Sequence, residues 1–215
     1  MSKYQVVLFD LDGTLIDTSE GIFNSVRYAE KMMGFSPIGD ETLKQFVGPP
    51  PTQSYMKYYA VAEDIARQAT TYHREYGLKH GIYEAEEYEG ISELLKSLKD
   101  TGVKLGVCTL KRQDVAEKVL EYFGLLPYFD VVVGIDKQES LTKADTINLA
   151  LRAIQHENKE DVVLVGDSEY DAVGAQRVGV EFLGVLYGFG LTEPRDHYEM
   201  ATDVCQLKNI LFRKK

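Results

Sequence analysis

The sequence predicts an α/β protein with a Rossmann-like parallel-sheet core and a small all-helical cap domain inserted after the first strand. Short apolar runs alternate with amphipathic stretches along most of the chain, and short connections join them. One long region without a strand pattern follows the first apolar run. Strands that alternate with helices through short connections form mostly parallel sheets.

Apolar runs rich in β-forming residues predict the buried strands. The first run is 4–9 (YQVVLF), and the others are 103–108, 130–134, 161–165 and 180–186. A strand that is covered on both faces has a nearly continuous apolar sequence. We therefore expect these runs to form the centre of a sheet that carries helices on both sides.

Helical periodicity fills the intervals between the later runs. The stretch 90–101 stops before Gly102, a residue favoured just beyond a helix end, and its apolar residues share one face: Ile91, Leu94, Leu95 and Leu98. The stretches 113–123 and 143–156 have a similar pattern. These helices are expected to cover the sheet.

The region 17–83 has helical spacing instead of strand patterns. Ile22, Val26, Ala29 and Met33 recur at that spacing, and 60–76 is also predicted to be helical. The prolines of 48–51 must interrupt a helix, because proline lacks an amide donor and fixes φ. We predict a cap domain at 17–83 and a core domain formed by 1–16 and 84–215.

Composition excludes several classes of protein. The 215 residues are 44% hydrophobic and 27% charged, which is ordinary for a soluble globular protein. The net charge of −10 argues against a nucleic-acid-binding surface. No run reaches the roughly 20 apolar residues of a membrane span, and no signal peptide precedes the first strand. We expect a cytoplasmic monomer or homodimer without membrane or nucleic-acid partners.

Polar residues follow the predicted strands where ligands bind in open α/β sheets, beyond the carboxyl ends of the strands. Asp10 and Asp12 follow the first strand, Thr109 follows the second, and Asp167 and Asp171 follow the run 161–165. Lys143 opens a predicted helix nearby. This convergence of carboxylates, a hydroxyl and an ammonium group is the main functional signal.

These residue types suit phosphoryl transfer with Mg²⁺. Neighbouring carboxylates repel one another unless a cation lies between them, and Mg²⁺ prefers oxygen ligands. A carboxylate nucleophile divides hydrolysis into two steps, and a second carboxyl group can move the proton. Lys143 can stabilise phosphoryl charge, while Thr109 and nearby backbone amides such as those of Gly13 and Leu110 can hold a phosphate oxygen.

At these residues the chain resembles the haloacid dehalogenase superfamily. The four motifs occur in order: DLDGT at 10–14, an apolar strand ending in Thr109, Lys143, and GDSEYD at 166–171. The resemblance covers nearly the whole chain, and the helical region after the first motif lies where this superfamily has its small cap. In related caps the loop equivalent to 48–51 affects specificity, so we expect it to close over the substrate.

The resemblance implies a role for each motif residue. Asp10 would be the nucleophile and Asp12 the general acid/base, while Thr109 and Lys143 would hold the phosphate. The ligands of Mg²⁺ would be Asp10, the backbone carbonyl of Asp12, and Asp167, with Asp171 in support. Dehalogenase members lack the aspartate equivalent to Asp12, so its presence favours phosphate chemistry.

More narrowly, the chain is similar to the phosphoglycolate phosphatase-like branch and to bacterial 5′-nucleotidases within it. The segments that carry this similarity are FVGPP at 46–50, YHREYG at 72–77, YDAVGA at 170–175 and GVLYGFG at 184–190. Ala144 stands where the branch often has proline, and Leu110-Lys111-Arg112 replaces Ser-Lys-Pro. The expected substrates are small phosphorylated metabolites, chiefly phosphoglycolate or nucleoside 5′-monophosphates.

Other functions and roles stay open at this point. A phosphomutase of the β-phosphoglucomutase type, a pyrophosphatase, a phosphorylated receiver domain and a silent binding protein are the alternatives. Lys111 and Arg112 fit either a solvated surface or the rim of an anion site. Cys108 is expected in the core, and the four histidines, which lack ligand spacing, are expected at the surface.

Overall fold

A computed structural model describes residues 3–195 and 197–213. Its main sheet has the strand order β5-β4-β1-β6-β7-β8, and every neighbouring pair is parallel. These strands are β1 (Val6–Phe9), β4 (Lys104–Arg112), β5 (Val131–Ile135), β6 (Val162–Gly166), β7 (Glu181–Val185) and β8 (Glu199–Ala201). Strands β4 and β5 lie on one side of β1, and the later strands β6, β7 and β8 lie on its other side. Open α/β sheets bind ligands where the strand order changes side in this way, so ligands are expected beyond the carboxyl end of β1.

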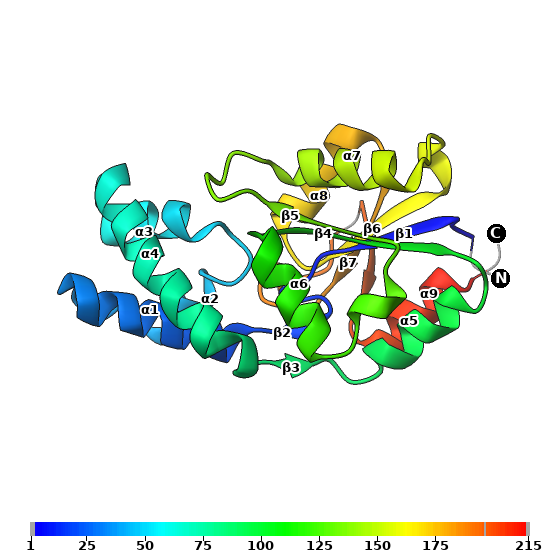
Figure 1. The fold of residues 1–215 in the computed structure, drawn as a ribbon. Helices are drawn as coiled ribbons and strands as arrows, with labels where there is room; N and C mark the ends of the chain where they lie inside the picture. The colour runs from blue at the N-terminus through cyan, green and yellow to red at the C-terminus, as the bar shows by residue number, and fades with distance from the viewer. Residues whose placement is uncertain (1–2, 196, 214–215) are drawn as a thin grey trace.

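Alternating side chains of β1 contribute to two apolar cores. Val7 and Phe9 pack into one, and Val6 and Leu8 pack into the other. Helices cover both faces of the sheet, with α7 and α8 on one side and α5, α6 and α9 on the other (Figure 1). Their bounds are α5 (Ile91–Lys99), α6 (Gln113–Tyr122), α7 (Lys143–Ile154), α8 (Glu169–Val178) and α9 (Val204–Leu211).

The segment between the first strand and the rest of the sheet is helical and forms a lobe beside the sheet (Figure 1). Its helices are α1 (Ser19–Met33), α2 (Asp40–Lys44), α3 (Pro51–Tyr59) and α4 (Glu63–Lys79). Buried side chains give this lobe an apolar core, the cap cluster, which includes Val26, Leu43, Phe46, Tyr55 and Ala69. The predicted fold class, a parallel-sheet core with a helical cap, is confirmed.

A two-stranded antiparallel ribbon joins the lobe to the rest of the chain. It pairs β2 (Ile16–Asp17) with β3 (Glu86–Glu87). We predicted neither strand, because two residues are too few to show an alternating pattern. The 3₁₀ turns are Gly81–Tyr83, Leu126–Tyr128 and Lys159–Asp161.

The predicted strands and sheet helices all occur, within a few residues of their expected bounds. The larger differences are that β4 extends past Thr109 to Arg112 and that the predicted helix 60–76 begins at Glu63, after Ala60 takes a left-handed φ of 51°. Within the described ranges, no helix is both long and apolar enough to cross a membrane. The domain bounds stay a prediction, and residues 1–2, 196 and 214–215 of the expected core lie outside the described residues.

Candidate active site

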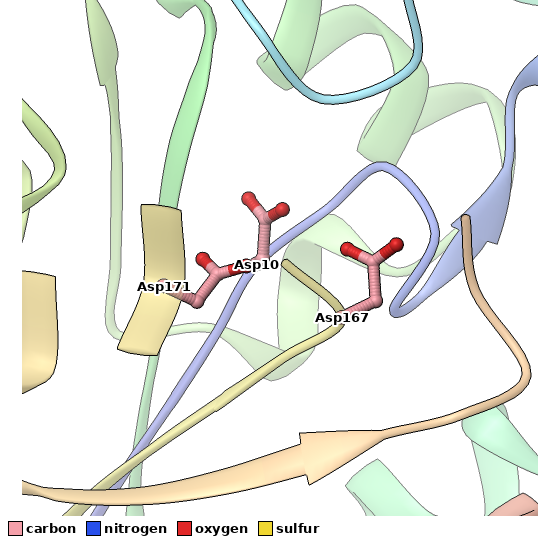
Figure 2. Close-up of side chains that lie close together, drawn as sticks. All are labelled: Asp10, Asp167 and Asp171. Atoms are coloured by element: carbon pink, nitrogen blue, oxygen red, sulfur yellow. The ribbon is translucent and has the colours of Figure 1, made fainter. Parts of the chain in front are cut away.

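Three buried carboxylates meet at the carboxyl edge of the sheet (Figure 2). Asp10 follows β1, Asp167 follows the neighbouring β6, and Asp171 lies in the first turn of α8. One oxygen from each lies within 4.8 Å of the others. The parallel register of β1 and β6 brings Asp10 and Asp167 together, because the two strands end side by side.

Backbone groups hold Asp167 in a fixed direction. The amides of Phe189 and Gly190 donate to its Oδ2 at 2.7 and 3.1 Å. Gly13 has a φ of 76°, and a Cβ at this position would lie 2.4 Å from the same oxygen. Gly13 is therefore needed both for the left-handed turn and for the space that Asp167 occupies.

Asp171 has a structural role in addition to its place in the cluster. Its Oδ2 accepts hydrogen bonds from the amide and hydroxyl of Ser168, at 3.0 and 2.5 Å, in a capping box at the start of α8. Its Oδ1 faces the Lys143 ammonium at 2.6 Å. The helix cap thus fixes the side chain so that one oxygen points into the site.

Lys143 lies between two of the carboxylates. It is the first residue of α7, where Thr142 and Asp145 form a capping box. Its Nζ lies 2.7 Å from Asp10 Oδ1 and 2.6 Å from Asp171 Oδ1. The side chain is only 4% exposed, so its charge acts on the carboxylates with little screening from water.

Gly174 in α8 provides the space for the Lys143 stem. A Cβ at this position would lie 2.7 Å from Lys143 Cγ and 2.8 Å from Lys143 Cβ. We expect Gly174→Ala to displace the ammonium and to lower kcat by about 100-fold, the scale of a small misplacement of a catalytic group. Gly39→Ala is the control, because a Cβ at Gly39 meets nothing within 4 Å. Equal steady-state rates in both variants would contradict this role.

Asp12 faces a different part of the site from Asp10. Its Oδ1 accepts a hydrogen bond from the Thr18 hydroxyl at 2.6 Å and lies 2.9 Å from Lys111 Nζ. The Thr109 hydroxyl accepts from the backbone amide of Lys111 at 3.1 Å. Thr109, predicted to hold phosphate, is thereby tied to the residue that contacts Asp12.

Burial controls the acidity of the cluster. It raises the pKa of Asp10 to about 7; the Lys143 ammonium opposes this shift, while the charges of Asp171 and Asp12 add to it. Burial, with the charges of Asp171 and Asp10, raises the pKa of Asp167 to about 8. Burial alone lowers the pKa of Lys143, but the two facing carboxylates raise it above its ordinary range, so Lys143 stays protonated.

The donor set fits a divalent cation. Lys143 faces Asp10 and Asp171, Lys111 faces Asp12, and Asp167 has no lysine partner among the described ion pairs. The four carboxylates therefore carry two negative charges more than the two ammonium groups balance when all are ionised. Oδ1 of Asp10 and Oδ1 of Asp171 are both buried, and one ammonium, that of Lys143, faces the two oxygens at 2.7 and 2.6 Å. Buried oxygens with excess negative charge are the ligands that Mg²⁺ prefers. The Asp12 carboxylate is outside the group of three close carboxylates.

A pocket between the helical lobe and the sheet opens on Asp12. Apolar side chains line most of it, including Ile22, Phe46, Leu78, Ile82, Leu110 and Val115. Gly48, Pro49 and Pro51 of the predicted cap loop also line it. The cationic residues in its wall are Arg74, Lys111 and Arg112.

His73 also lines this pocket, which corrects the prediction that all four histidines lie at the surface. It is buried on the inner face of α4, and its Nδ1 lies 3.3 Å from the Tyr55 hydroxyl. A single histidine on a helix gives no sequence signal of burial. Burial, with the charges of Lys111 and Arg74, lowers its pKa to about 3.

This shift predicts a pH-dependent stability. The unfolded chain binds a proton at His73 below about pH 6.5, whereas the folded chain does so only near pH 3. Stability is therefore complete above pH 6.5 and falls as the pH drops toward 3, by about 2 kcal/mol between pH 7 and pH 5. His73→Asn should remove this loss of stability. The measurement is the free energy of unfolding by denaturant at pH 7 and at pH 5, compared between the variant and the wild type. An unchanged pH dependence would contradict the assignment.

Several site residues gave little or no sequence signal. Thr18 belongs to no motif that we recognised, and Gly174 lies in the segment 170–175, which was quoted only for its similarity to relatives. The roles of both residues follow only from the contacts with Asp12 and Lys143. Lys111 was left open between surface and anion site, and the structure shows its side chain 15% exposed against Asp12. Arg112 instead pairs with its neighbour Asp114.

Comparisons with known proteins identify the family of the chain. The model of the haloacid dehalogenase-like hydrolase family matches residues 7–185. A 5′-nucleotidase from Pseudomonas aeruginosa is 34% identical over 97% of this chain and 96% of its own. Pyrophosphatase PpaX from Halalkalibacterium halodurans is 34% identical over 86% of this chain and 85% of its own.

A solved structure extends the likeness to the fold. The crystal structure of a predicted phosphatase from Clostridium acetobutylicum superposes with a TM-score of 0.90 at 38% identity, over 96% of this chain and 97% of the other. The predicted resemblance is confirmed over almost the whole chain. The chain belongs to the haloacid dehalogenase-like hydrolases and, within that family, is a phosphatase.

Proposed function

We propose that the chain is a Mg²⁺-dependent phosphomonoesterase that carries the phosphoryl group on Asp10 and acts on nucleoside 5′-monophosphates. The observation that carries the proposal is the position of Asp10, which is buried, lies 2.7 Å from the Lys143 ammonium and shares a cluster with Asp167 and Asp171. The segment 17–83 would act as a cap domain on a core formed by 1–16 and 84–215.

In the first step an Asp10 oxygen attacks phosphorus, and the bond from phosphorus to the ester oxygen breaks. Asp12 gives its proton to the leaving oxygen, and Lys143 balances the charge on the phosphoryl oxygens. Bound by Asp10, Asp167 and the Asp12 carbonyl, with Asp171 in support, Mg²⁺ would supply further positive charge.

In the second step water attacks the phosphorus of the aspartyl phosphate, and Asp12 takes the proton of that water. The bond between phosphorus and the Asp10 oxygen breaks, which releases inorganic phosphate and restores the carboxylate. The Thr109 hydroxyl and the amides of Gly13 and Leu110 would hold the phosphoryl group through both steps.

The charge of the pocket on the Asp12 side favours a neutral leaving group. Each cation in its wall already faces a carboxylate of the protein: Lys111 faces Asp12, Arg74 faces Glu139, and Arg112 faces Asp114. A glycolate or a second phosphate would need an unpaired cation, whereas a nucleoside does not. The apolar wall suits a base, and one similar protein is a 5′-nucleotidase.

Phosphate release from a panel of compounds tests the proposal. The panel holds nucleoside 5′-monophosphates, phosphoglycolate, pyrophosphate and hexose phosphates, each with Mg²⁺ and with a chelator. We expect release from the nucleotides to be fastest and to stop with the chelator. Faster release from phosphoglycolate or pyrophosphate would contradict the neutral leaving group. An isomeric sugar phosphate in place of inorganic phosphate would indicate a mutase.

Cytoplasmic location and a monomeric or homodimeric state stay predictions that rest on the sequence.

A further inference from the structure

The loop after β7 lies directly against Asp167. The amides of Phe189 and Gly190 donate to the Asp167 carboxylate, and the amide of Leu191 donates to its backbone carbonyl at 2.6 Å. The Tyr187 hydroxyl adds a bond to the carbonyl of Thr14 at 3.0 Å. The loop therefore fixes both the main chain and the carboxylate of Asp167.

The loop and Asp167 lie too close together for a side chain at Gly188. A Cβ at Gly188 would lie 2.4 Å from Asp167 Cβ and 2.4 Å from the carbonyl oxygen of Gly13. Because the loop touches Asp167 this closely, a shift of the loop must change the direction of the carboxylate.

The Phe189 side chain reaches in the opposite direction, to the helical lobe. It packs against the cap cluster, whose buried members include Ile22, Phe46 and Tyr55. Among the described residues of that cluster and those packed against it, Phe189 is the one from outside 17–83. One residue therefore contacts a carboxylate of the site through its amide and the lobe through its ring.

We propose that Phe189 is a positioning residue that couples the helical cap to the direction of the Asp167 carboxylate and so to Mg²⁺ affinity. The inference rests on the proposed Mg²⁺ site. With the partly buried ring packed against the lobe, the loop is held and its amides keep Asp167 aligned. Coupling is reciprocal, so Mg²⁺ also favours the arrangement in which the lobe covers the ring.

Calorimetric titration with Mg²⁺ alone tests this coupling. We expect Phe189→Ala to weaken Mg²⁺ binding by about 10- to 100-fold, the range for loss of a group that orients a metal ligand. Phe189→Leu keeps an apolar contact and should retain most of the affinity. Saturating Mg²⁺ should restore much of the kcat of Phe189→Ala, because Asp10 and Lys143 are unchanged.

Phe35→Ala is the matched control. Phe35 also packs on the cap cluster, where its ring stacks on that of Tyr59 with 4.8 Å between the ring centroids. Unlike Phe189, Phe35 belongs to the lobe itself. We expect this variant to bind Mg²⁺ like the wild type. Equal weakening in both alanine variants would overturn the coupling, because the effect would come from a loosened lobe.

The remaining outcomes separate this inference from the proposed function. Wild-type affinity in a folded Phe189→Ala overturns the coupling and leaves the Mg²⁺ site intact. If Phe189→Ala fails to fold, Phe189→Leu and Phe189→Gln carry the test. The coupling is supported if Phe189→Leu keeps the wild-type Mg²⁺ affinity and Mg²⁺ dependence of kcat while Phe189→Gln binds Mg²⁺ more weakly. Wild-type affinity in both variants overturns the coupling. Absence of Mg²⁺ binding by the wild type overturns both proposals.

Discussion

Asp10→Asn is expected to abolish phosphate release while the protein remains folded. The amide cannot attack phosphorus, so kcat should fall by a factor on the order of 10⁵ to 10⁶, the scale for loss of a covalent nucleophile. The substitution keeps the shape of the side chain and removes one charge from the carboxylate cluster. Initial rates with the preferred substrate at saturating Mg²⁺ measure the loss.

The stability of the same variant provides its control. Burial raises the pKa of Asp10 from 3.8 to about 7, so its contribution to stability is complete below pH 3.8 and is lost as the pH rises to about 7. At pH 8 without Mg²⁺, Asp10→Asn should therefore melt at or above the temperature of the wild type. Normal turnover in a folded Asp10→Asn would exclude Asp10 as the nucleophile.

Lys143→Met should damage both turnover and stability. The ammonium is buried and faces Asp10 and Asp171 at 2.7 and 2.6 Å, so its removal leaves those carboxylates without their counter-charge. Loss of one partner of a buried ion pair costs about 3–5 kcal/mol, which lowers the melting temperature by roughly 10 °C for a chain of this size. We expect kcat to fall on the order of 1,000-fold, because the phosphoryl oxygens lose a charged partner.

Added Mg²⁺ separates these two effects of Lys143. The cation can compensate the carboxylates, so it should restore part of the melting temperature, but it cannot replace the ammonium at the phosphoryl group. Lys118→Met at an exposed position of α6 serves as the control and should change neither property. A melting temperature equal to that of the wild type, without Mg²⁺, would show that Lys143 does not balance the cluster.

The sequence predicted the parts of the molecule that repeat a pattern. Apolar runs gave the central strands, because β1 and β6 are buried along their whole length. The positions of Asp10 and Asp167 after those strands were enough to predict that they meet, since parallel neighbours end at one edge. Their roles in catalysis stay predictions until the variants are measured.

What could not be predicted depends on contacts between distant segments. The burial of His73, the pairing of Lys111 with Asp12 and the space beside Gly174 arise from packing between elements that no local pattern connects. The loop at 187–190 is a further example, because its sequence similarity to relatives gave no indication that Phe189 contacts the lobe.

The ribbon formed by β2 and β3 has a consequence for how the fold can change. The chain leaves for the helical lobe at Asp17 and returns at Glu86, and these two residues are paired across the ribbon. The lobe therefore connects β2 to β3 in the way that a turn connects the two strands of a hairpin. A change in the length of the chain between these two residues therefore need not alter the pairing of β1 with β4.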